Sequence, residues 1–416
     1  MVAETTQHDV EWILTLFGTA VGAGVLFLPI QAGLGGVWPI VILSCFSFPL
    51  VWLSHRSLTH LVVTHAPPCE LTRIIEEDLG TSAGTVINLL FSIFFLGMVV
   101  AYSTGLINLA SSYIEHQMGM IAMPRSVLSL LIALGLSAVM LAAGEDALLH
   151  ITSAVTFPLI AALLFLSVYM IPMWSGAIFS MTPTAHDLIK SLMLLIPIMA
   201  FSMDFSPICS LLAISYREHY ADARVAMRRS DRTVYWTSLL LMVFVMFFVL
   251  SCVLATRPGE LDYALKHNID ILTLMSLHIK PPLLRYLYPL LAFGAILHSY
   301  FSVFLKARSG LIQLAGRLTR RTLAVASHHT DKPHPVEWIT TLLIAVPLWC
   351  VAYGNPSILA IIGMLAAPIL ALVCYLMPVY LFYRIPRLAI YRDRSGIVVL
   401  LSGLCVMFSY LIGSLL

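Results

Sequence analysis

Long apolar runs separated by short polar segments dominate the pattern of this chain. A run of about 20 mostly apolar residues is long enough for an α-helix to cross the hydrocarbon core of a bilayer. Eleven such runs are found, at residues 11–31, 37–63, 84–114, 123–143, 147–173, 189–214, 233–256, 283–307, 336–354, 356–384 and 395–415. The pattern predicts an all-α integral membrane protein with eleven transmembrane helices, and the longest runs indicate tilted or broken helices.

The composition supports this interpretation and excludes a soluble domain. The chain of 416 residues is 60% hydrophobic and 11% charged, with a mean hydropathy of +0.93, whereas roughly a quarter of the residues in a soluble domain are charged. The seven cysteines have no paired or metal-ligand spacing, so we expect them to act as small apolar residues. Residues 1–10 carry acids and no basic segment, which predicts a short tail rather than a cleaved signal peptide.

Basic residues between the runs predict the orientation, because lysine and arginine gather in cytoplasmic loops. If the N-terminus is cytoplasmic, most of the 23 lysines and arginines fall on the cytoplasmic side. An odd number of spans then places the C-terminus on the periplasmic side.

Three connections hold features of their own. Residues 217–232 are basic, which favours a solvated helix at the lipid headgroups. Residues 261–278 show the apolar spacing of a helix on the outer side, and both a lid over an outer vestibule and simple packing would explain it. Residues 327–334, SHHTDKPH, include side chains that can bind metals, but they form a short linker and no metal site is expected there.

Three of the predicted helices carry residues that a plain apolar helix avoids. The first contains Gly18, Gly22 and Gly24 near its middle, the sixth contains Asp204 in the stretch FSMDFSP, and the eighth contains His298. At a rise of 1.5 Å per residue, Asp204 and His298 lie about 20 Å into spans that run in the same direction. All three features therefore fall near the centre of the bilayer.

Each feature also has an explanation that needs no function. Small residues four positions apart, like Gly18 and Gly22, allow two helices to pack closely. A single histidine within a span is often a packing residue. The glycines do not form a dinucleotide-binding loop, because no strand precedes them. Asp204 is harder to explain by packing, since an ionisable group at this depth costs several kcal/mol unless it faces a cavity or a partner.

Broken helices at the same depth predict a secondary transporter. Backbone unwinds inside a membrane only where it is buried in protein or lines a cavity, and many transporters place two broken helices at the midplane, one in each inverted repeat. Breaks in spans 1 and 6 fit a five-plus-five repeat. We therefore expect a cytoplasmic tail at 1–10, a first repeat at 11–173, a second repeat at 187–384 and an eleventh span at 395–415.

Several stretches resemble the hydroxy and aromatic amino acid permease family, within the amino acid–polyamine–organocation superfamily and nearest its bacterial serine/threonine branch. They are FGTAVGAGVLFLPIQAGLGG at 17–36, FPLVWLSHRSLT at 48–59, VVAYSTGLIN at 99–108, IPIMAFS at 196–202 and NPSILAIIGMLAAPILALVCYLMP at 355–378. The resemblance implies a LeuT-like fold with eleven spans in the bacterial inner membrane. It also implies uptake of an amino acid together with a proton or, in some members, sodium.

The resemblance also implies site residues. The backbone of Thr19, Ala20, Val21, Gly22, Ala23 and Gly24 would hold the substrate, with Tyr102, Asn108, Ser202, Asp204, Phe205 and Ser206 around it, and coupling would involve Asp204, His298, Ser299 and Ser302. No cofactor, metal, nucleic acid or obligate protein partner is implied. The expected partners are an amino acid substrate and the lipid bilayer.

Two departures from the family pattern leave the function open. Serine-type relatives typically read Phe-Ser-Phe-Asn-His-Ser-Pro where this chain has FSMDFSP, and Lys-Ser-Phe where it has HSY. Asp204 and His298 then replace a neutral amide and a fixed cation. The first hypothesis, which we favour, is proton-coupled uptake of a small neutral amino acid, serine- or threonine-like, with protonation of His298 or Asp204 tied to substrate occupancy.

In the second hypothesis, Asp204 is the counter-charge for a basic amino acid or an amine. A transport-inactive amino acid sensor is a third possibility. A membrane-embedded enzyme is disfavoured, because no nucleophile motif or paired aspartates accompany Asp204 and His298.

Overall fold

The computed structural model describes residues 7–65, 69–121, 123–142, 144–180, 183–257, 259–279, 281–319 and 335–416. Over these ranges every regular element is helical, in agreement with the predicted all-α class. The linker at 327–334 and the first six residues of the predicted N-terminal tail lie outside the described residues.

The first half of the chain contains α1 (Gln7–Ala20), α2 (Ala23–Leu34), α3 (Val37–Thr64), α4 (Leu71–Leu79), α5 (Thr81–His116), α6 (Arg125–Ala142) and α7 (Gly144–Tyr169), followed by the short turns η1 (Ile171–Met173) and η2 (Gly176–Ser180). The middle contains α8 (Ala185–Ser202), η3 (Ser206–Ile208), α9 (Cys209–His219), α10 (Ala223–Ala255), α11 (Glu260–His267), α12 (Ile271–His278) and α13 (Pro282–Thr319).

The last part contains α14 (Pro335–Tyr353), then α15 (Ile358–Ile361), η4 (Ile362–Ala366), α16 (Ala367–Leu370), η5 (Ala371–Leu376) and α17 (Met377–Arg384) as one continuous span, and finally η6 (Pro386–Tyr391) and α18 (Arg394–Leu415). Two stretches of this continuous span, η4 and η5, are π-helical.

Nine helical segments in the described ranges are long and apolar enough to cross a membrane, and α1 with α2 forms a tenth that is bent by 59°. The shorter apolar helix Trp338–Tyr353 lies where another span is predicted. Every predicted apolar run therefore corresponds to helix, and the first span is broken as expected. The full count of eleven remains a prediction.

The connections at 217–232 and 261–278 both contain helix. Within residues 217–232, α9 ends at His219 and α10 begins at Ala223, residues 221–225 are exposed, and α10 continues into the apolar run. On the other side, residues 261–278 fold into α11 and α12, and the side chain of Asp270 caps α12 by accepting the N–H groups of Leu272 and Thr273. Residues 271–276 of α12 are buried against α13, α2 and α5, so packing accounts for this segment.

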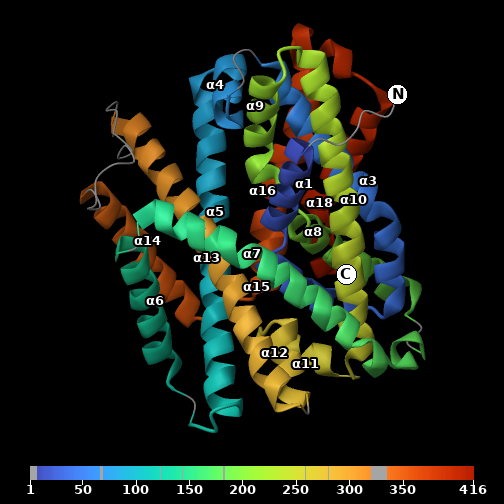
Figure 1. Ribbon diagram of the computed structural model, residues 1–416, viewed down its shortest axis with the longest axis vertical. Helices are drawn as coiled ribbons and strands as arrows, with labels where there is room; N and C mark the ends of the chain where they lie inside the picture. The colour runs from blue at the N-terminus through green and yellow to red at the C-terminus, as the bar shows by residue number, and fades with distance from the viewer. Residues whose placement is uncertain are drawn as a thin grey trace.

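Long helices packed in pairs surround the broken first span (Figure 1). In this bundle α13 packs along α5, α10 along α3, and α18 along α8. The second half of the broken span, α2, is buried from Ala23 to Gly33 and packs against α8 and α10. The break between α1 and α2 is thus held in the interior by helices from distant parts of the chain.

Candidate functional site

The break in the first span leaves backbone groups free at the centre of the molecule. Helix α1 ends at Ala20 and α2 begins at Ala23, with Gly22 in an extended conformation between them (φ −147°, ψ −155°). The Ala23 N–H donates to Ser299 Oγ of α13 at 2.9 Å. Among the described residues, the N–H groups of Gly22 and Gly24 have no hydrogen-bond acceptor. The ends of two short helices therefore present unpaired donors and carbonyls to the same space.

The three glycines of this span also allow close packing. A Cβ atom would lie 2.6 Å from a methyl carbon of Thr156 at Gly18, 2.5 Å from Ser299 Oγ at Gly22, and 3.0 Å from the Phe201 ring at Gly24. Helices α7, α13 and α8 therefore reach the backbone of span 1 at these points. The packing explanation and the broken-helix explanation apply to the same residues.

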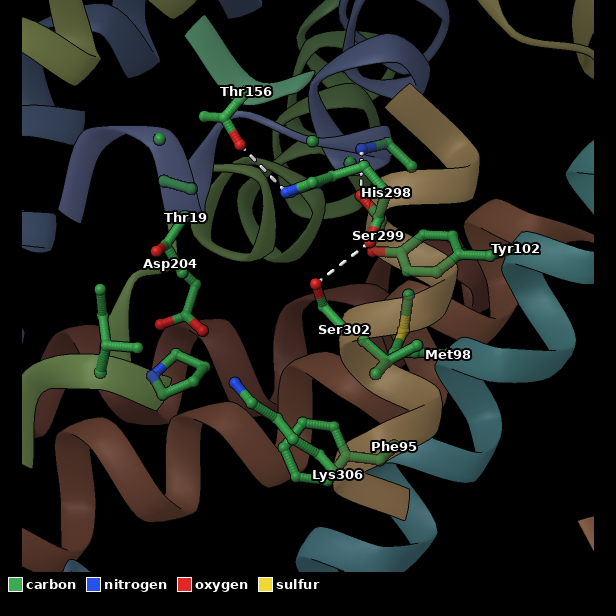
Figure 2. A pocket seen from close by; sticks show the side chains of 18 of the residues that line it. Thr19, Phe95, Met98, Tyr102, Thr156, Asp204, His298, Ser299, Ser302 and Lys306 are labelled. Carbon is green, nitrogen blue, oxygen red and sulfur yellow. Dashed lines mark hydrogen bonds between the residues drawn. The ribbon is translucent and has the colours of Figure 1, made fainter. Parts of the chain in front are cut away.

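A cavity of about 560 Å³ lies at this break (Figure 2). Its volume falls within the range of ordinary small-molecule sites, about 300–1,000 Å³. Most of the residues that the sequence analysis singled out line it: Thr19, Ala20, Gly22, Ala23, Gly24, Tyr102, Asp204, His298, Ser299 and Ser302.

The cavity extends from the break toward one end of the molecule. Its wall continues along Leu14 and Thr15 of α1 and along Lys306 and Ser309 of α13. Leu14 and Thr15 are exposed, whereas α2 on the other side of the break is buried from Ala23 to Gly33. The site is therefore open along α1 and closed along α2.

The sixth span is also interrupted, but here side chains satisfy the backbone. Helix α8 ends at Ser202 and α9 begins at Cys209. The N–H and hydroxyl groups of Ser206 donate to the two carboxylate oxygens of Asp204, at 3.1 Å and 3.0 Å. The hydroxyl of Ser202 lies 2.9 Å from the Gly24 carbonyl and 2.8 Å from the Ile198 carbonyl, so its one hydrogen is shared between the second break's own helix and the first break.

His55, from α3, completes the second break. Its Nε2 atom lies 3.1 Å from Asp204 Oδ1 and 3.1 Å from the Phe205 nitrogen, and the His55 and Asp204 side chains are 2% and 7% exposed. His55 is not among the site residues predicted from the sequence. Its only signal there is a histidine within the apolar run 37–63, in the stretch FPLVWLSHRSLT that resembles the permease family.

Phe205 differs from its expected role. Its ring stacks on His55 with centroids 3.8 Å apart, and the side chain is fully buried and does not line the cavity. Val21 is likewise fully buried without lining the cavity, and Ser202 serves as the link between the breaks. Ser206 lines a second, adjoining cavity.

Asp204 and His298 line the same cavity but have different partners. His298 Nε2 lies 3.1 Å from Thr156 Oγ1 of α7, and its Nδ1 atom is buried without a hydrogen-bond partner among the described residues. No hydrogen bond or ion pair within the described part of the chain joins Asp204 to His298. Asp204 pairs with His55 instead, and His298 with Thr156, as Figure 2 shows for the latter.

Asn108 lies away from the cavity, contrary to expectation. Its side-chain nitrogen donates to the Asn268 carbonyl at 2.8 Å, and its oxygen accepts from Arg125 at 2.6 Å. Asn355 joins the same network, and both Asn268 and Asn355 have positive φ angles, of 55° and 51°. This network links α5, α6 and the loops that precede α12 and α15.

The second cavity, of about 340 Å³, adjoins the first. Asp204 and Lys306 line both cavities. Glu70, Asn88 and Gln313 line the second cavity farther from the break. Polar groups therefore lead from Asp204 toward the same end of the molecule as the main opening.

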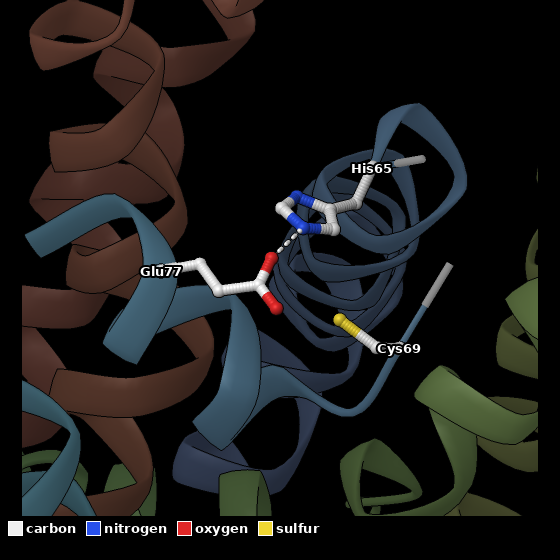
Figure 3. Close-up of side chains that lie close together, drawn as sticks. All are labelled: His65, Cys69 and Glu77. Carbon is white, nitrogen blue, oxygen red and sulfur yellow. Dashed lines mark hydrogen bonds and ion pairs between the residues drawn. The ribbon is translucent and has the colours of Figure 1, made fainter. Parts of the chain in front are cut away.

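A cluster outside the bundle has the residue types of a metal site: His65, Cys69 and Glu77 (Figure 3). His65 Nδ1 accepts from Arg387 at 2.9 Å, which leaves Nε2–H to donate to Glu77 at 2.7 Å. Burial and the nearby Glu77 raise the pKa of the Cys69 thiol, so the thiolate that a metal needs is disfavoured. The hydrogen bonds from His65 and Arg73 lower the pKa of Glu77. The cluster is satisfied as an ion-pair network.

Comparison with known proteins identifies the family. A model of the tryptophan/tyrosine permease family matches residues 9–384. The chain belongs to the tryptophan/tyrosine permease family. It is 35% identical over 406 residues to the serine transporter SdaC of Escherichia coli K12, with 96% of this chain and 93% of the relative covered. It is 32% identical to the threonine/serine transporter TdcC of Escherichia fergusonii, with 93% and 91% covered.

Solved structures confirm the fold of this permease. MhsT in complex with L-phenylalanine matches with a TM-score of 0.57 at 14% identity, over 99% of this chain and 98% of that protein. Mhp1, a nucleobase-cation-symport-1 family transporter, matches with a TM-score of 0.57 at 10% identity, over 98% and 91%. The permease therefore has a LeuT-like transporter fold, and, as the sequence predicts, it is a multi-pass membrane transporter rather than an enzyme.

Proposed function

We propose that this permease carries a small neutral amino acid, serine- or threonine-like, into the cytoplasm together with a proton. The cavity at the break of span 1 is the observation that carries the proposal, because it brings unpaired backbone groups and titratable side chains into one space. The names of the curated relatives favour serine or threonine as the substrate. We place the protein in the bacterial inner membrane with a cytoplasmic N-terminus, so the cavity opens toward the cytoplasm.

The broken span supplies both halves of an amino acid site. The substrate carboxylate would accept from the free N–H groups of Gly22 and Gly24 at the start of α2, where the helix dipole also favours an anion. The substrate ammonium would donate to the carbonyls at the end of α1, near Thr19. Tyr102 and Ser302 line the remaining wall and offer hydroxyl groups to a serine-sized side chain.

The surroundings of Asp204 disfavour a basic substrate. Its carboxylate already accepts hydrogen bonds from the N–H and hydroxyl groups of Ser206 and contacts His55, so it is not free to bind a cationic substrate group. Lys306 also lines the cavity and would repel a basic side chain. These contacts support the neutral-substrate hypothesis over the counter-charge hypothesis.

A proton is the coupling ion that the cavity residues favour. Asp204 and His298 line the cavity, His55 contacts Asp204, and all three can gain or lose a proton. Ser299, at which a coupling ion would be expected by resemblance, already binds the Ala23 N–H. No resident cofactor enters this proposal.

Uptake into proteoliposomes tests the proposal directly. Purified protein would be given labelled serine, threonine, alanine, phenylalanine, lysine and putrescine, under an inward proton gradient, an inward sodium gradient or no gradient. We expect serine or threonine to accumulate under the proton gradient alone. Accumulation of lysine or putrescine would contradict the neutral substrate, sodium-driven accumulation would contradict the proton, and binding without any movement would support a sensor.

A further inference from the structure

His55 and Asp204 lie close enough to share one proton, and the other contacts of His55 define where its ring hydrogen lies. His55 Nδ1 lies 2.8 Å from the carbonyl oxygen of Val51, one helical turn earlier in α3. A carbonyl oxygen only accepts hydrogen bonds, so Nδ1 carries a hydrogen. The Nε2 atom of the neutral ring then carries one lone pair, 3.1 Å from both the Phe205 nitrogen and Asp204 Oδ1.

In the unprotonated pair, the single lone pair of Nε2 accepts the Phe205 N–H and Oδ1 accepts the Ser206 N–H, each at 3.1 Å. His55 Nε2 and Asp204 Oδ1 are 3.1 Å apart, and an ionised carboxylate also offers only lone pairs. One proton between the two atoms turns the contact into a hydrogen bond, either as imidazolium with carboxylate or as imidazole with carboxylic acid. Because the two groups are coupled, the proton belongs to the pair.

We propose that this His55–Asp204 pair is the site that binds the transported proton, an inference that rests on the proposed proton symport. One proton enters from the outside, is held between Nε2 and Oδ1, and leaves to the cytoplasm, with no other bond made or broken. Asp204 lines the open cavity, so the proton has a path to water, while His55 is buried behind it.

The remaining groups near Asp204 leave the pair as the proton site. Lys306 faces Asp204 from α13 across both cavities. The other titratable groups that interact with it electrostatically are Tyr102, Cys209, Cys374 and Tyr375, which are ordinarily neutral. His298 bonds to Thr156 instead. Loss of the proton would leave the Nε2 lone pair to the Phe205 N–H, and Lys306 would then attract the ionised carboxylate.

Proton release therefore acts on the second break. Without the proton, Asp204 accepts the Ser206 N–H and His55 accepts the Phe205 N–H, so both side chains bind the interrupted backbone between α8 and α9. A proton on Nε2 uses the only lone pair of that atom, so proton binding replaces the Phe205 contact with the contact to Asp204, and proton release restores it. Ser202 connects the same backbone to Gly24, beside the proposed substrate site. Protonation and substrate binding are thereby linked through the two breaks.

The same helix offers a matched control. His60, five residues after His55 on α3, pairs with Asp231 of α10 at 2.5 Å, and neither residue lines the central cavity. The His60–Asp231 pair is also a histidine–aspartate contact, but it lies outside the central cavity. His60→Gln should therefore preserve proton coupling, whereas His55→Gln and Asp204→Asn should remove it.

The experiment measures two activities in proteoliposomes: exchange of labelled serine without a gradient, and serine accumulation under an inward gradient of one pH unit. The wild type and His60→Gln should exchange serine and accumulate it up to about tenfold, the value of one proton over one pH unit. Asp204→Asn and His55→Gln should exchange serine but reach only equal concentrations on both sides.

These two measurements distinguish failure of the proposed function from failure of the proposed proton site. A wild type that shows no proton-driven accumulation contradicts the proposed function itself. Proton-driven accumulation that survives in Asp204→Asn or His55→Gln overturns the pair, and loss of both exchange and serine binding in a folded variant assigns the pair to the substrate and also overturns it. If the neutral variants do not fold, Asp204→Glu decides: we expect accumulation with a shifted pH profile, and an unchanged profile overturns the proposal.

Discussion

The two broken spans solve the same structural problem in different ways. In span 1 the break consists of small residues, and its unpaired N–H groups at Gly22 and Gly24 face a cavity. In span 6 the break consists of polar side chains, and Asp204 and His55 occupy its backbone donors. A break with free backbone groups is suited to a ligand, whereas a break closed by titratable side chains is suited to a proton.

This difference separates substrate binding from coupling. Changes at span 1 should lower affinity and transport together, because they alter the groups that hold the substrate. Changes at span 6 should reduce proton-driven accumulation far more than exchange.

The largest effect is expected for Gly22→Ala. Its new Cβ would lie 2.5 Å from Ser299 Oγ, so the serine must turn away and abandon the Ala23 N–H. A crowded contact and a lost hydrogen bond each cost about 1–3 kcal/mol. Serine exchange should fall about 10- to 100-fold. Gly135→Ala is the control, because nothing lies within 4 Å of that position and exchange should be unchanged.

Ser299→Ala should have a smaller effect and should change the effect of Gly22→Ala. Removing the hydroxyl leaves the buried Ala23 N–H without its acceptor, a cost of about 1–3 kcal/mol, so serine binding should weaken about tenfold. In this background Gly22→Ala no longer meets the serine hydroxyl. A double-mutant cycle of serine binding should therefore be strongly non-additive; additive effects would show that the two residues do not interact.

Arg125→Gln tests the network outside both breaks. Arg125 donates to Asn108, to Asn355 and to the carbonyls of Ala352 and Tyr353. Its loss should reduce thermal stability by about 1–3 kcal/mol, in line with the loss of hydrogen bonds to a charged group. A thermal melt in detergent measures this change. The ratio of accumulation to exchange should stay at the wild-type value, and a changed ratio would show that this network takes part in coupling.

The smallest effect is expected at the His65 cluster. Both nitrogens of His65 are already hydrogen-bonded, and burial raises the pKa of the Cys69 thiol, so we expect no bound metal to contribute to the fold. Cys69→Ser and treatment with a chelator should each leave the melting temperature and serine exchange unchanged. A clear drop after chelation, restored by zinc, would contradict this interpretation.

The sequence predicts the spans and the first break because their signals are local. Apolar run length locates the helices, and Gly18, Gly22 and Gly24 mark a weakened helix within a single stretch. The resemblance to a known family then suggests the site. Most of the predicted residues line one cavity, although they come from α1, α2, α5, α8 and α13.

The partners of the titratable residues are not predictable in this way. Depth along a span places Asp204 and His298 at one level, but the rotation of each helix decides that Asp204 meets His55 and that His298 meets Thr156. The prediction that Asn108 lines the cavity is wrong for the same reason, since its hydrogen-bond partners come from loops far along the chain. The spacing of residues along a span predicts their depth in the membrane, whereas the packing of the helices decides which way their side chains point.

Proton movement driven by serine tests the central claim most directly. A pH-sensitive dye inside proteoliposomes would report acidification when serine is added outside without a pH gradient. We expect acidification for the wild type and for His60→Gln, and none for Asp204→Asn, although that variant still exchanges serine. Acidification by Asp204→Asn at the wild-type rate would contradict the assignment of the transported proton to the His55–Asp204 pair.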